Sequence, residues 1–116
     1  MQTLTRAYAK LGRIFTNKIK VGTSGTDIKQ ISIGTVALDP ASLAALTKAN
    51  TDFTLTGAAD GDVVLMVPPS DLEDDLLPCG AVVTAANTVS VYLYNGSDSA
   101  VDGAEKTWTY IWLDLT

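Results

Sequence analysis

The residues most able to do chemistry in this chain are carboxylates. Four of them fall in one short segment, namely Asp71, Glu73, Asp74 and Asp75. Asp60 and Asp62 form a second pair around a glycine. Clustered carboxylates could hold a calcium ion, but neither group has the ligand spacing and central glycine of an EF-hand loop. We therefore expect a solvated acidic loop and a turn between strands, with no metal site and no cofactor.

Several residue types that support enzyme chemistry are absent or isolated. The chain has no histidine, which removes the commonest general base and the commonest zinc ligand. Serine and threonine are abundant, but no G-x-S-x-G nucleophile elbow occurs. Cys79 is the only cysteine, so it cannot form an internal disulfide, and its simplest interpretation is a small buried hydrophobe. These observations predict a protein that is not an enzyme.

Positive charge is concentrated at the N-terminus. Five of the eight basic residues precede Asp27, the first acidic residue, and they are Arg6, Lys10, Arg13, Lys18 and Lys20. The remainder of the chain contains all 13 acidic residues, and the net charge is -5. An acidic body lacks the basic stripe that binds phosphates, which argues against a nucleic-acid-binding domain. No apolar run approaches the roughly 18 residues of a membrane span, so no membrane partner is expected.

The basic N-terminus also carries apolar residues at spacings of three and four. They are Leu4, Tyr8, Leu11, Ile14 and Phe15. This spacing predicts a short amphipathic helix, although Gly12 weakens it. We interpret residues 1–26 as an anchoring arm and linker, in which the apolar residues contact a partner and the basic residues steer and tether the arm. The alternative is a helix that packs on its own domain with its lysines in solvent.

From Asp27 onward the sequence is typical of an all-β domain. Short runs of threonine, valine, isoleucine and aromatic residues are divided by glycine, asparagine, aspartate and proline. This pattern predicts a single β-sandwich or jelly-roll-like domain over residues 27–116. The expected strands are residues 28–38, 51–57, 62–67, 79–85, 88–95 and 106–115. In the first, Ile31 and Ile33 have the opposite parity to Val36 and Leu38, which predicts a β-bulge near Gly34. Asn95-Gly96 is interpreted as a tight turn.

The last two predicted strands alternate between aliphatic and aromatic residues. Their aliphatic residues are Val89, Val91, Leu93, Ile111, Leu113 and Leu115. Their aromatic residues are Tyr92, Tyr94, Trp108, Tyr110 and Trp112. We expect the aliphatic set to form the core, which would leave the five rings on an opposite face. Three kinds of cover would suit that face: a second sheet or loop, a subunit interface, or sugars stacked on the rings.

One pattern of turns and strands resembles a known family. Its elements are Thr56-Gly57-Ala58-Ala59, Gly61-Asp62, Pro68-Pro69, Leu72-Glu73, Gly80, Ala86-Asn87-Thr88-Val89, Asn95 and Thr107-Trp108. This succession is similar to that of small virion proteins of tailed bacteriophages, over about residues 21 to 112. Members typically have arginine or another polar residue where this chain has Tyr92. The segment before residue 21 is not part of the shared pattern.

The resemblance implies a structural subunit of a phage particle, made in the host cytoplasm and located on the capsid exterior. Such proteins decorate or cement the capsid, or form the tips of fibres or spikes. For partners, the resemblance implies a homotrimer that is attached to the major capsid protein or to another virion protein. The aromatic residues would then be shared between subunits, and the basic arm would dock on an acidic neighbour. The alternative from a different class is a carbohydrate-binding β-sandwich module.

Overall fold

Runs rich in β-branched and aromatic residues form six strands in the computed structural model, which describes residues 13–116. The strands are β1 (Gln30–Leu38), β2 (Lys48–Thr54), β3 (Val63–Val67), β4 (Leu76–Ala85), β5 (Thr88–Asn95) and β6 (Lys106–Asp114). All six strands expected from the sequence are present, and their ends differ from the expected ones by up to three residues. Within residues 13–116, no helix is long and apolar enough to cross a membrane.

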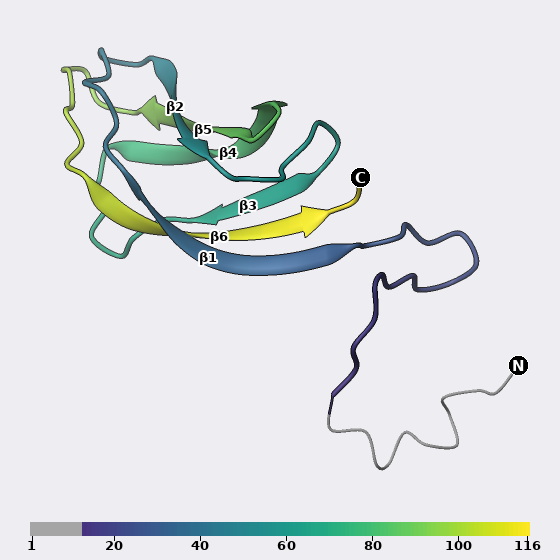
Figure 1. Ribbon diagram of the computed structural model, residues 1–116. Coiled ribbons are helices and arrows are strands. Elements are labelled where there is room, and N and C mark those ends of the chain that lie inside the picture. The colour runs from purple at the N-terminus through teal and green to yellow at the C-terminus, as the bar shows by residue number, and fades with distance from the viewer. Residues whose placement is uncertain (1–12) are drawn as a thin grey trace, which may run out of the picture.

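The six strands form a β-sandwich, which confirms the predicted fold class (Figure 1). Two antiparallel three-stranded sheets have the orders β1-β6-β3 and β2-β5-β4. Only β4 and β5 form a hairpin, through Ala86 and Asn87, and Asn87 adopts the left-handed conformation with φ of 64°. The other four connections cross from one sheet to the other, as in a jelly-roll-like winding.

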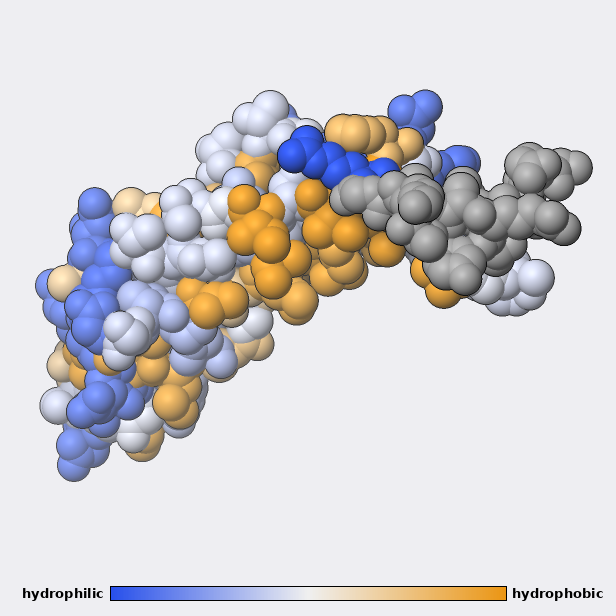
Figure 2. Space-filling view, turned by 90° about the horizontal axis from the view of Figure 1, so that it is seen from below, coloured by the Kyte–Doolittle hydropathy of each residue, from blue (hydrophilic) through white to orange (hydrophobic). Residues whose placement is uncertain are grey.

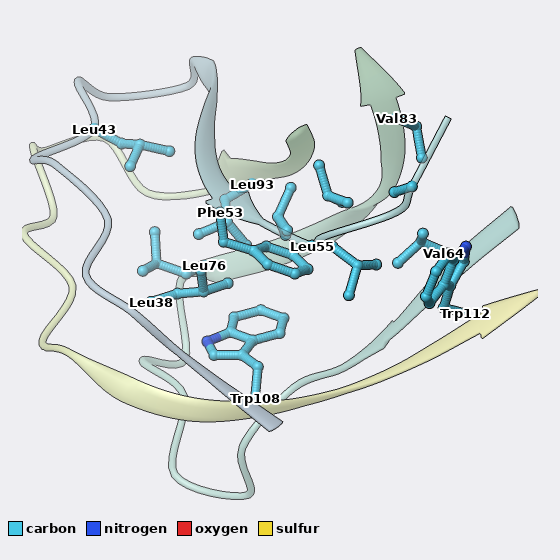
Figure 3. Packing of buried hydrophobic residues seen from close by; sticks show 13 residues of the cluster. Leu38, Leu43, Phe53, Leu55, Val64, Leu76, Val83, Leu93, Trp108 and Trp112 are labelled. Carbon is cyan, nitrogen blue, oxygen red and sulfur yellow. The ribbon is translucent and has the colours of Figure 1, made fainter. Parts of the chain in front are cut away.

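The core lies between the two sheets, and Trp108 is near its centre. Its side chain is 1 % exposed and points from β6 toward the opposite sheet (Figure 3). The Phe53 ring of β2 lies 5.9 Å from the Tyr110 ring of β6, measured between centroids. From β5, the core receives Val89, Val91 and Leu93, which are almost fully buried. On this strand the aliphatic residues face inward as predicted, and Tyr92 and Tyr94 lie half-buried on the outer side.

On β6 the orientation is the reverse of the prediction. Trp108 and Trp112 are buried at 1 % and 6 % exposure, and Tyr110 packs against the same core. Ile111 and Leu113 therefore lie on the outer side of the sheet. Aromatic side chains bury roughly 150–250 Å² each, so directing the rings inward removes more apolar surface from water. The five rings do not share a face, and the two tryptophans have almost no surface to offer to another subunit.

The predicted β-bulge near Gly34 is also wrong. β1 pairs with β6 from Gln30 to Leu38 without any shift of register. Gly34 lies opposite Tyr110, and a Cβ atom at this position would collide with the phenol ring. The glycine is therefore required for space. Since the register never slips, Ile31 and Ile33 stay on the outer side of the sheet.

Asn95 joins two loops at one end of the sandwich, where the sequence predicts a tight turn. Its side chain is completely buried, and its Nδ2 donates to the backbone oxygens of Leu43, Ala44 and Ser99 at 3.1, 3.2 and 2.9 Å. Its Oδ1 accepts a hydrogen bond from the Ser97 backbone amide at 2.9 Å. The residue thus links the β1–β2 loop to the β5–β6 loop, and the prediction of a simple Asn-Gly turn is wrong.

The central position of Trp108 leads to a test of stability. We expect Trp108→Ala to lower the free energy of unfolding by about 3–5 kcal/mol, because it removes a large buried side chain and leaves a cavity. Tyr94→Ala, on the outer side of the other sheet, is the matched control and should cost much less. Urea denaturation followed by circular dichroism measures both values. Similar losses for the two variants would contradict the assignment of Trp108 to the core.

Candidate functional site

The carboxylates identified in the sequence are not gathered into a metal centre. Within residues 13–116, no group of three or more His, Cys, Asp or Glu side chains is placed to hold a metal ion. Two of these carboxylates, Asp62 and Glu73, instead make hydrogen bonds that hold loops to strand β6. Their role in the described part of the chain is structural.

Asp62 fixes the turn before β3 to the end of β6. Its Oδ2 accepts from the Ala59 amide at 3.0 Å and from Trp112 Nε1 at 3.1 Å. Its Oδ1 accepts from the Leu115 amide and from Thr116 Oγ1, both at 3.0 Å. Burial by itself would raise the pKa of Asp62, but these four hydrogen bonds outweigh it and hold the pKa below its usual value. The residue therefore does more than form a simple turn.

Glu73 is half-buried, so the expectation that the whole acidic loop is solvated is wrong at this position. Its Oε1 accepts from the Ala104 amide at 3.1 Å and lies 3.0 Å from Lys106 Nζ. The hydrogen bond from Ala104, followed by the one from Lys106, lowers the pKa of Glu73. The β3–β4 loop is thereby held against the start of β6.

The most distinctive surface is the outer side of the β1-β6-β3 sheet, which we call the apolar face. Its apolar residues are Ile31, Ile33, Val63, Leu65, Val67, Ile111 and Leu113. They form rows across the three strands, because Leu113 of β6 pairs with Ile31 on one side and Val63 on the other. In the next row Ile111 pairs with Ile33 and Leu65, and Ile33 is 70 % exposed. Figure 2 shows hydrophobic side chains gathered along this side of the molecule.

The apolar face carries no charge. Its remaining positions are Thr35, Ala37, Thr107 and Thr109. The outer side of the other sheet is different, because there Asp52 accepts hydrogen bonds from Ser90 Oγ at 2.5 Å and Asn50 Nδ2 at 2.8 Å. On the same side Lys48 Nζ lies 5.0 Å from the centre of the Tyr92 ring. The outer side of that sheet therefore mixes these polar groups with exposed Leu77 and Val82, while the β1-β6-β3 sheet presents a continuous apolar patch of the kind that marks an interaction site.

The second feature is the arm, of which the structure describes only part. Leu4, Arg6, Tyr8, Lys10 and Leu11 of the predicted anchor lie outside the described residues. Its other members, Arg13, Ile14, Phe15, Lys18 and Lys20, are all exposed. Residues 13–20 contain no helix, so the predicted amphipathic helix does not extend into this segment.

The described part of the arm extends away from the sandwich (Figure 1). It doubles back on itself through an antiparallel bridge in which Ile19 and Ile28 exchange backbone hydrogen bonds of 2.9 and 2.8 Å. Lys18 Nζ and Asp27 form an exposed ion pair at 3.0 Å beside this bridge. None of residues 13–20 is buried against the sandwich. Residues 13–20 therefore do not form a helix packed on their own domain, which was the alternative interpretation of the arm.

Comparisons with protein families, curated proteins and solved structures find no match. The surfaces described above are therefore the basis for a functional proposal. The sequence did contain an indication of the apolar face, because Ile31 and Ile33 have the wrong parity for the core that Val36 and Leu38 enter. The predicted bulge at Gly34 attributes this change of parity to a slip of register, which does not occur.

The hydrogen bonds to Asp62 predict a pH dependence of stability. Folding lowers the pKa of Asp62, so as the pH falls the carboxyl group takes up a proton more readily in the unfolded chain than in the folded one. The hydrogen bonds therefore stabilise the fold above about pH 4, and this stabilisation is lost below it. We expect Asp62→Asn to be less stable than the wild type at pH 7, with a difference that shrinks as the pH falls below about 4. Urea denaturation over this range measures it, and Asp60→Asn controls for the loss of one negative charge. A difference that does not change with pH would contradict the role of the Asp62 carboxylate.

Proposed function

We propose that the protein is a non-enzymatic structural subunit of a bacteriophage particle, which decorates or cements the outside of the capsid. The observation that carries the proposal is the combination of an uncharged, exposed apolar face with an exposed basic arm on an acidic domain. Residues 21 to 112 resemble small virion proteins, and this resemblance is the reason for proposing a phage particle as the assembly.

The apolar face supports a role in assembly. Its open area of about 500 Å² matches the largest apolar patch of a typical monomer, and such a patch is often a functional surface that meets another chain. Small β domains with few charges gain stability by association, since a closed ring of copies covers apolar surface and strand edges. A homotrimer remains our proposal for the assembled form. Tyr92 and Tyr94 stay accessible for contacts with a neighbouring chain, whereas Trp108 and Trp112 do not.

The basic arm supports attachment to an acidic partner, which we propose is the major capsid protein or another virion protein. Arg13, Lys18 and Lys20 are exposed in the described part of the arm. Charges at the rim of an interface mainly raise the rate of association and make binding sensitive to salt. Several arms in one oligomer bind as a multivalent unit, so weak individual contacts give a long-lived attachment.

Two other functions are compatible with a β-sandwich. A fibre or spike tip would use the same sandwich and the same arm, and differs only in its position on the particle. A carbohydrate-binding module would need aromatic rings on its surface, and Trp108 and Trp112 are buried in the core. The burial of both tryptophans favours the structural role.

Binding to phage particles that lack the protein provides the test. We expect the full-length protein to co-sediment with the particles, and to bind less as the salt concentration rises. Removal of residues 1–20 should abolish binding, and replacing Arg13, Lys18 and Lys20 together by glutamine should weaken it. Lys48→Gln, on the sandwich, is the charge-matched control for a single lysine. Unchanged occupancy after removal of residues 1–20 would overturn the role of the arm, and cryo-EM of the particle would distinguish the capsid from a fibre tip.

A further inference from the structure

We propose that residues 13–21 of one copy, which we call the arm segment, cover the apolar face of a second copy. The interaction goes beyond attachment to a particle, since it requires only this chain. It names the part of the molecule that occupies the exposed outer side of the β1-β6-β3 sheet.

The molecule exposes two prominent sets of apolar side chains, which have complementary shapes. The apolar face is an open three-stranded sheet without charges. The arm segment is an irregular, largely unpaired stretch that exposes Ile14, Phe15, Ile19 and Val21, with Phe15 at 86 % and Val21 at 80 % exposure. A narrow chain with apolar side chains can lie across an open sheet and remove both surfaces from water.

Apolar and polar residues are separated by parity over residues 15–21 of the arm segment. Phe15, Ile19 and Val21 share one parity, while Lys18 and Lys20 have the other. Arg13 and Ile14 do not follow this alternation. In an extended chain these two sets point to opposite sides. The apolar side can therefore face the sheet while the lysines stay in solvent. The acidic domain of the second copy attracts these lysines, and its uncharged apolar face places no like charge beneath them.

The exposed apolar area differs between the two possible contacts. With roughly 150–200 Å² for each fully exposed side chain, the open part of the apolar face amounts to about 500 Å² per copy, below the ~800 Å² that each partner contributes to a standard interface. Two such faces pressed together would therefore make a small interface. The arm segment adds about another 500 Å², so a copy that both gives and receives an arm buries about 1,000 Å² in total, spread over two contacts in a ring and about twice the area of the bare face. This comparison favours the arm as the occupant over the bare face of a second copy.

The arm segment lies at the N-terminal end of β1, where Ile14 and Ile19 line a hollow together with Ile31 of the same copy. The bridge between Ile19 and Ile28 and the ion pair between Lys18 and Asp27 close a small ribbon before β1 begins. Beyond this ribbon, Ile14 and Phe15 are exposed at 65 % and 86 %. The rest of the apolar face, including Ile33, Leu65 and Val67, is exposed and therefore open to the arm of another copy. A head-to-tail exchange of this kind can close into a ring.

Disulfide trapping between two differently labelled chains tests the exchange. Cys79 is exposed, so its interpretation as a buried hydrophobe is wrong, and all variants therefore carry Cys79→Ser. Purified full-length Phe15→Cys is mixed with Ile33→Cys under mild oxidation, and we expect a cross-linked species that contains one chain of each kind. Phe15→Cys mixed with Leu77→Cys is the matched control, since Leu77 is 50 % exposed but lies on the other sheet. Equal cross-linking in the two mixtures would overturn the proposal.

Two further measurements complete the test. In the double variant Phe15→Cys/Ile33→Cys, a disulfide formed within one chain at high dilution, without cross-linking in the mixture, would show that the arm covers its own face. In sedimentation equilibrium, Ile33→Asp should weaken self-association by about tenfold or more, because the complex would bury a charge. Leu77→Asp should leave self-association unchanged. A wild-type protein that stays monomeric would overturn the proposal and also the proposed homotrimer. Attachment to a phage particle through the basic arm is tested separately, by co-sedimentation with the particles.

Discussion

The pleat of β6 determines most of what this molecule presents to its surroundings. Side chains of a strand alternate strictly between its two sides, and β6 has large apolar residues on both. Once Trp108 and Trp112 are buried, Ile111 and Leu113 must point outward. Because β6 is the central strand, its register with β1 and β3 places Ile31 and Leu65 on the same outer side. The apolar face is thus a direct result of filling the core with rings.

The sequence was sufficient to predict the strands, because glycine, proline and asparagine separate the β-branched runs so clearly. It was not sufficient to decide which side of β6 faces inward, since alternation shows which residues share a side but not which side is buried. β5 was predicted correctly because Val89 and Leu93 alternate with residues that bear polar groups. The bulge at Gly34 was wrong for a related reason: the prediction assumed that every isoleucine of β1 must enter the core. The fully buried side chain of Asn95 depends on two distant loops, which no local pattern reveals.

The acidic residues have two distinct roles that composition alone does not separate. Asp62 and Glu73 accept hydrogen bonds that hold loops to β6, so part of the negative charge belongs to the architecture. Others, such as Asp60 and Asp74, are exposed and contribute to the field around the domain. None lies on the apolar face. The negative charge of the domain attracts a basic segment over long range, which favours a fast rate of association. The uncharged apolar face can bury apolar side chains, which favours a long lifetime of the complex.

The apolar face also exists only in a folded chain. Its residues come from β1, β3 and β6, and β1 pairs with the last strand of the chain, so the face is complete only after distant segments have met. An unfolded copy would carry the arm but no surface to receive it, so the proposed association would be selective for folded copies. Among the described residues β1 pairs only with β6, and its other edge carries neither a charged residue nor a proline. Such an edge is prone to unwanted strand pairing. A neighbouring chain laid across this side of the sheet would cover the apolar face and shield the edge together, so that ordered assembly and protection from aggregation would depend on the same contact.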